Sequence, residues 1–214
     1  MPRSRPDKRR PDPRNGLLAA GGLAVLLLAA AVLLGYRALQ GSWPWEPPGT
    51  TAGVADIGGP FTLVDGSGRE VTEKSWPGKW LLVFFGFTHC PDVCPTTLAD
   101  LGQALDQLGP EADRLQPLFV TVDPERDTPA VMRDYVAAFG NRIAGLTGSA
   151  AQIAAVAKAY RVYYAKHPEG SDYSMDHTAI LYVMRPNGTM AGFMTPDTAT
   201  PAMVQRLKEL MAKG

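Results

Sequence analysis

The chain has 214 residues and a mass of 23.0 kDa, which allows one domain of ordinary size or two small ones. A hydrophobic share of 45% with 20% charged residues excludes a disordered protein, and 21 Lys+Arg against 21 Asp+Glu argue against a nucleic-acid-binding protein. The two cysteines are too few for a disulfide scaffold or a four-thiolate metal site.

The N-terminus combines a basic tail with an apolar segment. Residues 1–15 contain six basic and two acidic side chains, and residues 16–36 then contain no charge. As a helix, this segment spans roughly 30 Å, the thickness of a bilayer's hydrocarbon core. The alternative is a cleaved signal peptide, but residues 36–40 offer no convincing small-x-small cleavage site. We therefore expect a retained transmembrane helix over residues 16–36.

The flanking charges predict the orientation of this helix. Six basic residues precede the segment, and Arg37 is the only Lys or Arg between it and Arg69, so we expect a cytoplasmic N-terminus. The tail contains Asp7, Asp12 and four prolines, unlike an acid-poor amphipathic transit peptide, which favours a bacterial inner membrane over a mitochondrial one. Residues 37–57, rich in Pro, Gly and Trp, predict a linker, and the domain beyond it is expected to face the periplasm.

Residues 58–214 alternate strand and helix signals. Phe61–Val64 and the turn residues 65–68 predict an opening hairpin, and the apolar runs Trp80–Phe87 and Leu118–Val122 predict strands buried on both faces. Helical spacing of apolar side chains predicts four helices. These helices are expected after Pro95 (Leu98, Leu101, Leu105, Leu108), after Asp127-Thr128-Pro129 (Val131, Met132, Tyr135, Val136, Phe139), around Ile153–Tyr160 and around Met203–Met211.

A second hairpin is predicted before the last helix. Thr178–Met184 and Thr189–Met194 flank an Asn187-Gly188 turn. With a further strand expected between the second and third helices, the order of elements implies an α/β fold: a central mixed sheet with helices on both faces. This order is thioredoxin-like.

Both cysteines lie in one segment between the first buried strand and the first helix. Cys90 and Cys94 are separated by three residues, and Cys94 is expected at or near the N-cap of the helix, followed by Pro95. The helix dipole there favours a thiolate, and the carboxyl end of a strand in an α/β sheet is where ligands usually bind. Packing alone does not explain such a pair, so the choice is between redox and metal chemistry.

Two thiolates and one imidazole suit copper, especially Cu(I), whereas a structural zinc site usually has a fourth protein ligand. Three imidazoles are candidates. His177 precedes a predicted strand and is favoured; His89 adjoins Cys90, but neighbouring side chains tend to diverge; and His167 lies in a polar segment, predicted as a solvated loop over residues 165–174. Spacing alone leaves both His177 and His89 open.

Polar residues at the end of the second buried strand have a structural interpretation. Asp127 or Thr128 is expected to cap the following helix, and Asp123 is interpreted as a turn residue in preference to one that orients a ligand. Asp92 is either a solvated loop acid or a charge that a partner recognises. The methionines at helix-core spacing are expected to pack in the core and not to bind copper; they are Met132, Met203 and Met211.

Four segments carry a specific combination of motifs: GFTHCPDVCPTTLADL (86–101), VTVDPERDTPAVMRDYVAAF (120–139), GLTGSAAQIAAVAKAYRVYY (145–164) and DHTAILYVMRPNG (176–188). Together they resemble the Sco/SenC family of membrane-tethered, copper-binding assembly factors for cytochrome c oxidase. The resemblance covers nearly all of residues 58–212. It implies a thioredoxin-like domain in which Cys90, Cys94 and His177 bind one copper ion, and it favours His177 over His89.

The resemblance also implies partners. These are subunit II of cytochrome c oxidase, whose dinuclear copper centre would receive the metal, and an upstream copper donor or thiol reductant. The competing hypothesis is a thiol–disulfide oxidoreductase that uses Cys90 and Cys94 and needs no metal. A peroxidase is disfavoured because the Pro-x3-Thr-x2-Cys approach is absent: Phe87 and Pro91 stand three residues before the two cysteines.

Overall fold

The computed structural model describes residues 28–36 and 57–213. The chain divides into two compact units, Met1–Gly53 and Val54–Gly214, of which the described part of the first is a helix over residues 28–36. Within the described ranges, no helix combines the length and the hydropathy needed to cross a membrane. The predicted tail, most of the predicted transmembrane segment and the predicted linker up to residue 56 lie outside the described residues.

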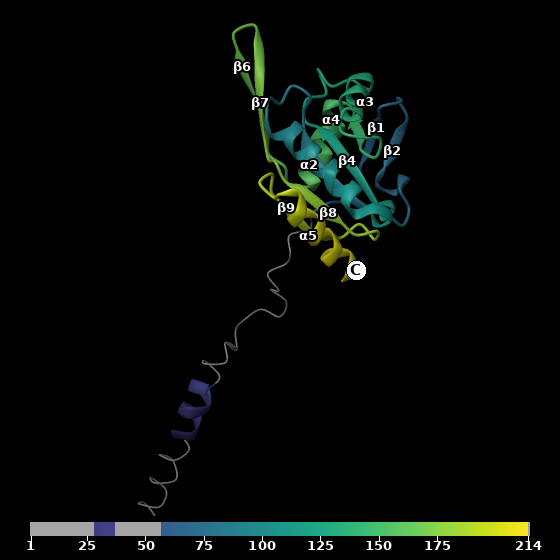
Figure 1. Cartoon of the computed structure of the whole chain (residues 1–214). Helices are drawn as coiled ribbons and strands as arrows, with labels where there is room; N and C mark the ends of the chain where they lie inside the picture. The colour runs from purple at the N-terminus through teal and green to yellow at the C-terminus, as the bar shows by residue number, and fades with distance from the viewer. Residues whose placement is uncertain (1–27, 37–56, 214) are drawn as a thin grey trace, which may run out of the picture. The chain divides into compact units, whose positions relative to one another are not determined.

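The second unit is built on a seven-stranded mixed sheet in the order β2-β1-β5-β4-β3-β8-β9 (Figure 1). The central strands β3, β4 and β5 are parallel, β1 and β8 pair antiparallel to them, and β2 and β9 pair antiparallel to β1 and β8. The strands are β1 (Thr62–Asp65), β2 (Glu70–Thr72), β3 (Trp80–Gly86), β4 (Leu115–Thr121), β5 (Ala144–Thr147), β8 (Leu181–Met184) and β9 (Met190–Met194).

The central strands are buried because helices cover both faces of the sheet. All seven residues of β3 are buried, as the apolar run predicts, and β4 has only one residue that is partly exposed. Each large apolar side chain buried here contributes about 1.5–3 kcal/mol of transfer free energy. The helices are α2 (Val93–Leu108), α3 (Pro129–Ala137), α4 (Ala150–Ala159) and α5 (Thr200–Ala212).

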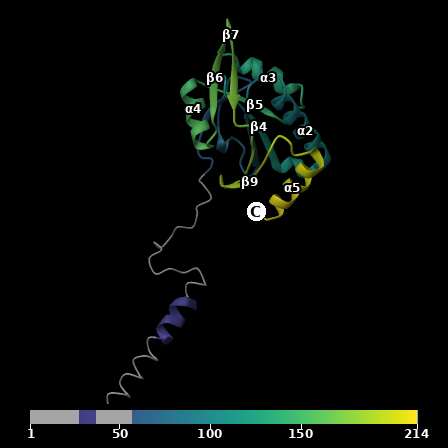
Figure 2. The ribbon, with the colours of Figure 1, turned by 90° about the vertical axis from the view of Figure 1, so that its left-hand side faces the viewer.

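Aromatic contacts assign the helices to the two faces. Phe84 and Phe119 lie side by side on one face, with ring centroids 6.0 Å apart, and Phe119 stacks on Tyr135 of α3. Phe85 points to the opposite face and contacts Tyr160 at the end of α4, with ring centroids 5.3 Å apart. Figure 2 shows α4 on one side of the molecule and α2, α3 and α5 on the other. The predicted α/β architecture is thereby confirmed.

The ends of these elements follow their local sequence. Thr128 caps α3 by accepting a hydrogen bond from the backbone N–H of Val131, and Pro129 is the first helical residue, as predicted. The expectation that Val131 packs inward is wrong, because this side chain is 37% exposed. Cys94, expected at or near the N-cap, lies in the first turn of α2, which begins at Val93 with Asp92 as its N-cap. The methionines predicted to be core residues are buried: Met132, Met203 and Met211.

A separate two-stranded hairpin replaces the polar loop that the sequence predicts over residues 165–174. The strands β6 (Tyr164–Glu169) and β7 (Asp172–His177) pair antiparallel to each other, and Gly170 adopts a φ of 61° at the tip. The hairpin projects from the carboxyl edge of the parallel strands (Figure 1). Its base lies at the pair Tyr164–His177, so the favoured histidine ends a strand.

Candidate metal site

Three segments far apart in sequence meet at one edge of the sheet. The cysteine loop follows β3, and β4 ends alongside β3 because Gly86 pairs with Thr121 in parallel register. β8 runs antiparallel to β3 and pairs Leu181 with Phe84, so its start lies at the same edge. His177, which closes the hairpin just before β8, is therefore brought to the cysteine loop by the topology of the sheet.

The first turn of α2 brings the two cysteines together. Cys90 is 9% exposed and Cys94 is fully buried, and neither forms a disulfide. The backbone N–H of Cys94 points at the Cys90 Sγ atom, with a distance of 3.4 Å. Backbone donors at a helix N-terminus favour negative charge, so the peptide geometry itself favours a thiolate at this sulfur.

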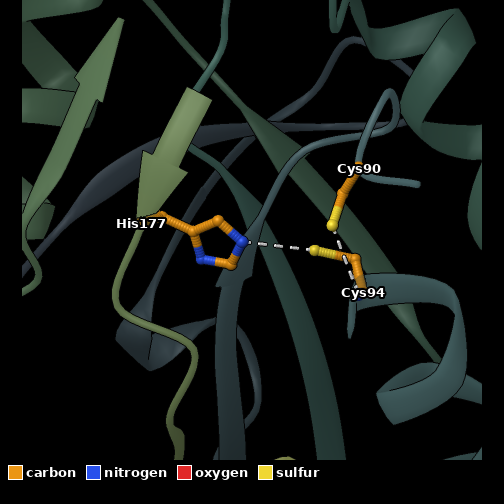
Figure 3. Close-up of side chains that lie close together, drawn as sticks. All are labelled: Cys90, Cys94 and His177. Atoms are coloured by element: carbon orange, nitrogen blue, oxygen red, sulfur yellow. Dashed lines mark hydrogen bonds between the residues drawn. The ribbon is translucent and has the colours of Figure 1, made fainter. Parts of the chain in front are cut away.

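The imidazole of His177 faces the sulfurs. Its Nε2 atom lies 3.5 Å from the Cys94 Sγ atom (Figure 3). Its Nδ1 atom lies 3.3 Å from the carbonyl oxygen of Thr178. Because a carbonyl can only accept, this contact assigns the proton to Nδ1 and leaves the Nε2 lone pair free for a ligand. Phe84 and Phe87 border the imidazole ring edge-on, with ring centroids 6.5 and 5.7 Å away.

The three side chains form a group that could hold a metal ion. The Sγ atoms of Cys90 and Cys94 and a ring nitrogen of His177 all lie within 4.8 Å of one another. Two soft thiolates and one imidazole are the donor set that suits copper. The three donors could hold one ion in a three-coordinate arrangement.

The pKa values of the two thiols are shifted in opposite directions. The Cys94 thiol hydrogen-bonds to Cys90 and, against the effect of burial, lowers the pKa of Cys90 from 9.0 to about 4, with further help from His177 and from the backbone N–H of Cys94. The same bond and burial raise the pKa of Cys94 well above its ordinary value. The metal-free pair therefore carries one negative charge at neutral pH, on Cys90, and binding a metal through both sulfurs releases one proton.

The other two candidate imidazoles are not in this group. His89 is exposed, and its Nδ1 atom lies 3.2 Å from the hydroxyl of Thr88. His167 is exposed on β6, and its Nε2 atom lies 2.9 Å from a carboxylate oxygen of Asp176. Asp92 is exposed and makes no side-chain capping bond, so it remains available to solvent or a partner.

Asp127 and Asp123, which follow β4, make buried hydrogen bonds that the sequence does not indicate; of the two predicted caps it is Thr128 that caps α3. Asp127 does not cap α3; it is fully buried and accepts hydrogen bonds from the hydroxyls of Thr88 and Thr121, at 2.5 and 2.6 Å. Asp123 does form a turn through its backbone carbonyl, but its buried carboxylate also accepts from the Tyr173 hydroxyl at 2.8 Å. The interpretation of Asp123 as a turn residue is incomplete.

The fold and the site together define an α/β protein with a cysteine–cysteine–histidine group at the carboxyl edge of its sheet. The SCO1/SenC family model matches residues 49–212. The chain belongs to the SCO1/SenC family.

Individual relatives agree with this assignment. Protein SCO1 homolog 1, mitochondrial, of Arabidopsis thaliana is 42% identical over 167 residues, which cover 75% of this chain and 50% of the relative, so the chain spans about half the length of that protein. The crystal structure of Arabidopsis thaliana ScoI with copper bound has a TM-score of 0.70 at 40% identity and covers 74% of this chain and 99% of its own. Bradyrhizobium japonicum ScoI with copper bound has a TM-score of 0.67 at 45% identity, covering 72% and 99%.

Proposed function

We propose that this chain is a copper metallochaperone in which the Cys90 and Cys94 sulfurs and the His177 Nε2 atom bind one copper ion. The observation that carries the proposal is the convergence of these three donors within 4.8 Å, from two segments at one edge of the sheet. Relatives of about 40% identity are described as copper-bound, which supports copper over other soft ions. The acceptor we propose is subunit II of cytochrome c oxidase, at its dinuclear copper centre.

We also propose the setting in which this chemistry takes place. A thioredoxin-like domain over residues 58–214 would be held by a transmembrane helix at 16–36 and a linker at 37–57, facing the periplasm from a bacterial inner membrane. The uncharged 21-residue segment and the basic tail before it support this arrangement. An upstream copper donor or a thiol reductant would restore the site after each delivery.

The experiment is an anaerobic transfer assay from the copper-loaded chain to copper-free subunit II, with metal and thiols counted on both proteins before and after. A chaperone moves copper and leaves the thiol counts unchanged. The variant His177→Ala is expected to lose transfer, whereas the matched control His89→Ala, which removes an exposed imidazole beside Cys90, is expected to retain it. Equal transfer by the two variants would contradict the proposed ligand set.

The opposite acidities of the two cysteines favour a second candidate function, a thiol–disulfide reductase. The Cys90 thiolate would attack a disulfide of the partner and release one partner thiolate, which takes up a proton from Cys94. Cys94 would then attack Cys90, forming the Cys90–Cys94 disulfide and releasing the second partner sulfur. Two electrons pass to the partner, and His177→Ala would spare this activity; in the transfer assay, thiol counts would change without metal transfer.

A further inference from the structure

The segment Asp123–Asp127 contacts both of the segments that carry the proposed copper ligands. It follows β4 and precedes α3, so it lies at the same edge of the sheet as the metal site. Toward the cysteine loop, Asp127 accepts hydrogen bonds from the backbone N–H of Thr88 at 3.1 Å and from its hydroxyl at 2.5 Å. Thr88 stands two residues before Cys90, so this contact fixes the start of the cysteine loop.

The same segment contacts the hairpin through Tyr173. The Tyr173 hydroxyl donates to the Asp123 carboxylate at 2.8 Å, and the Arg126 guanidinium donates to the Tyr173 carbonyl at 3.1 Å. Two cations lie over the ring, since the Arg126 Cζ atom and the Lys166 Nζ atom are each 3.8 Å from its centroid. Lys166 also pairs with Glu125 at 2.7 Å. Tyr173 stands four residues before His177.

These contacts matter because the hairpin is not part of the main sheet. Its strands pair only with each other among the described strands, and neither strand contains a fully buried residue; Tyr164 and Met175, near its base, are partly buried against the core. At the base, the Thr178 N–H donates to the Tyr163 carbonyl and the Thr178 hydroxyl accepts from the Tyr163 N–H, so these bonds join the two ends of the hairpin to each other. By contrast, Asp123 is 3% exposed, and a hydrogen bond to a buried carboxylate is stronger than one between neutral groups.

We propose that the segment Asp123–Asp127 is a bridge that sets the position of the imidazole relative to the two sulfurs, with Tyr173 as the positioning residue for His177. The inference rests on the proposed function, because the distance that the bridge sets is useful only where the three donors bind one ion. The bridge holds the cysteine loop through Asp127 and the hairpin through Asp123, Glu125 and Arg126. Removing the contacts between the bridge and the hairpin is expected to weaken metal binding by the His177 imidazole and to leave the two thiolates in place.

The test compares Tyr173→Phe with Tyr163→Phe in the full-length chain. The first variant removes the hydroxyl that meets Asp123 and keeps the ring between its two cations; the second removes a hydroxyl from a side chain that is 64% exposed. Backbone amide exchange over residues 164–177 is measured on the metal-free protein. Copper affinity and the nitrogen coupling in the Cu(II) spectrum are measured after addition of copper.

For Tyr173→Phe we expect hairpin exchange to rise about tenfold and Cu(II) binding to weaken about tenfold, with reduced nitrogen coupling, from the loss of one charge-assisted hydrogen bond. Cu(I) binding is expected to change less, because soft thiolates dominate its affinity. Tyr163→Phe is expected to match the unmodified chain. If Tyr173→Phe also matches it in both exchange and nitrogen coupling, the base contacts alone position His177 and the bridge is refuted.

Two further variants keep the outcomes distinct. His177→Ala tests the ligand set itself: if it leaves copper affinity unchanged, the proposed function fails, and hairpin exchange in Tyr173→Phe still decides the bridge. Lys166→Met, which removes a partly exposed cation from the ring and from Glu125, serves if Tyr173→Phe does not fold. It is expected to raise hairpin exchange about threefold, and unchanged exchange would overturn the proposal.

Discussion

Gly86, the last residue of β3, leaves the space that the Cys94 side chain occupies. A Cβ atom at this position would lie 2.6 Å from the Cys94 Sγ atom and 2.6 Å from the Cε2 atom of Phe119. Neither neighbour has room to withdraw, because Cys94 and Phe119 are both fully buried. We therefore predict that Gly86→Ala both destabilises the fold and disturbs the metal site.

The expected magnitude follows from these two contacts. Ordinary van der Waals contact begins at 3.4 Å, so the sulfur and the ring each have to move by at least 0.8 Å. Overpacking of this kind costs about 1–3 kcal/mol of unfolding free energy, which lowers the Tm of a domain of this size by about 3–10 °C. Because the displaced sulfur is a proposed ligand, we also expect copper affinity to fall about tenfold.

The assay is thermal unfolding of the metal-free protein together with copper titration. Gly192→Ala is the matched control, because it also adds one methyl group to a strand glycine, but with nearest neighbours at 3.4 Å. The control is expected to keep its Tm within about 2 °C of the unmodified chain, since the new methyl group makes no close contact. A Gly86→Ala protein with unchanged Tm and unchanged copper affinity would refute the packing described here.

Three further outcomes are expected. The pKa of Cys90 is lowered to about 4, so alkylation of the metal-free protein should follow a thiolate that titrates near pH 4 and be lost in Cys90→Ser; a midpoint near 9 would contradict the assignment. Burial alone would raise the pKa of Asp65, but hydrogen bonds from Ser67 and Arg69 outweigh this effect and lower the pKa from 3.8 to about 2. The stability that the ionised Asp65 carboxylate contributes is present above pH 3.8 and is lost as the pH falls through about 2. In denaturant titrations, Asp65→Asn should therefore lower the free energy of unfolding by about 1–2 kcal/mol at pH 7 and by almost nothing at pH 2. Leu82→Ala, at a fully buried position in β3, should cost about 2–5 kcal/mol in urea unfolding, and a cost below about 1 kcal/mol would count against the core as described.

Hydrophobic patterning predicted most of the fold because most elements pack one or both faces against the core. The apolar run from Trp80 became β3, and the leucine spacing after Pro95 became α2. The β6–β7 hairpin was missed for the same physical reason. Its residues are exposed or only partly buried, so its sequence lacks a continuous apolar pattern and has the composition of a loop.

The candidate site was predictable in part. The position of the cysteines between a buried strand and a helix indicated their chemistry, but spacing left His177 and His89 open, and the family resemblance favoured His177. The structure brings His177 to the sulfurs and leaves His89 exposed; binding of a metal there stays a prediction. The contact between Tyr173 and Asp123 joins residues 50 positions apart, which no local pattern in one sequence reveals.

The most direct test of the central claim is X-ray absorption spectroscopy of the copper-loaded chain, which counts the atoms bound to the metal. Two sulfurs and one imidazole nitrogen are predicted, with the nitrogen lost in His177→Ala and kept in His89→Ala. A copper ion without sulfur neighbours, or one whose surroundings are the same in both variants, would contradict the account.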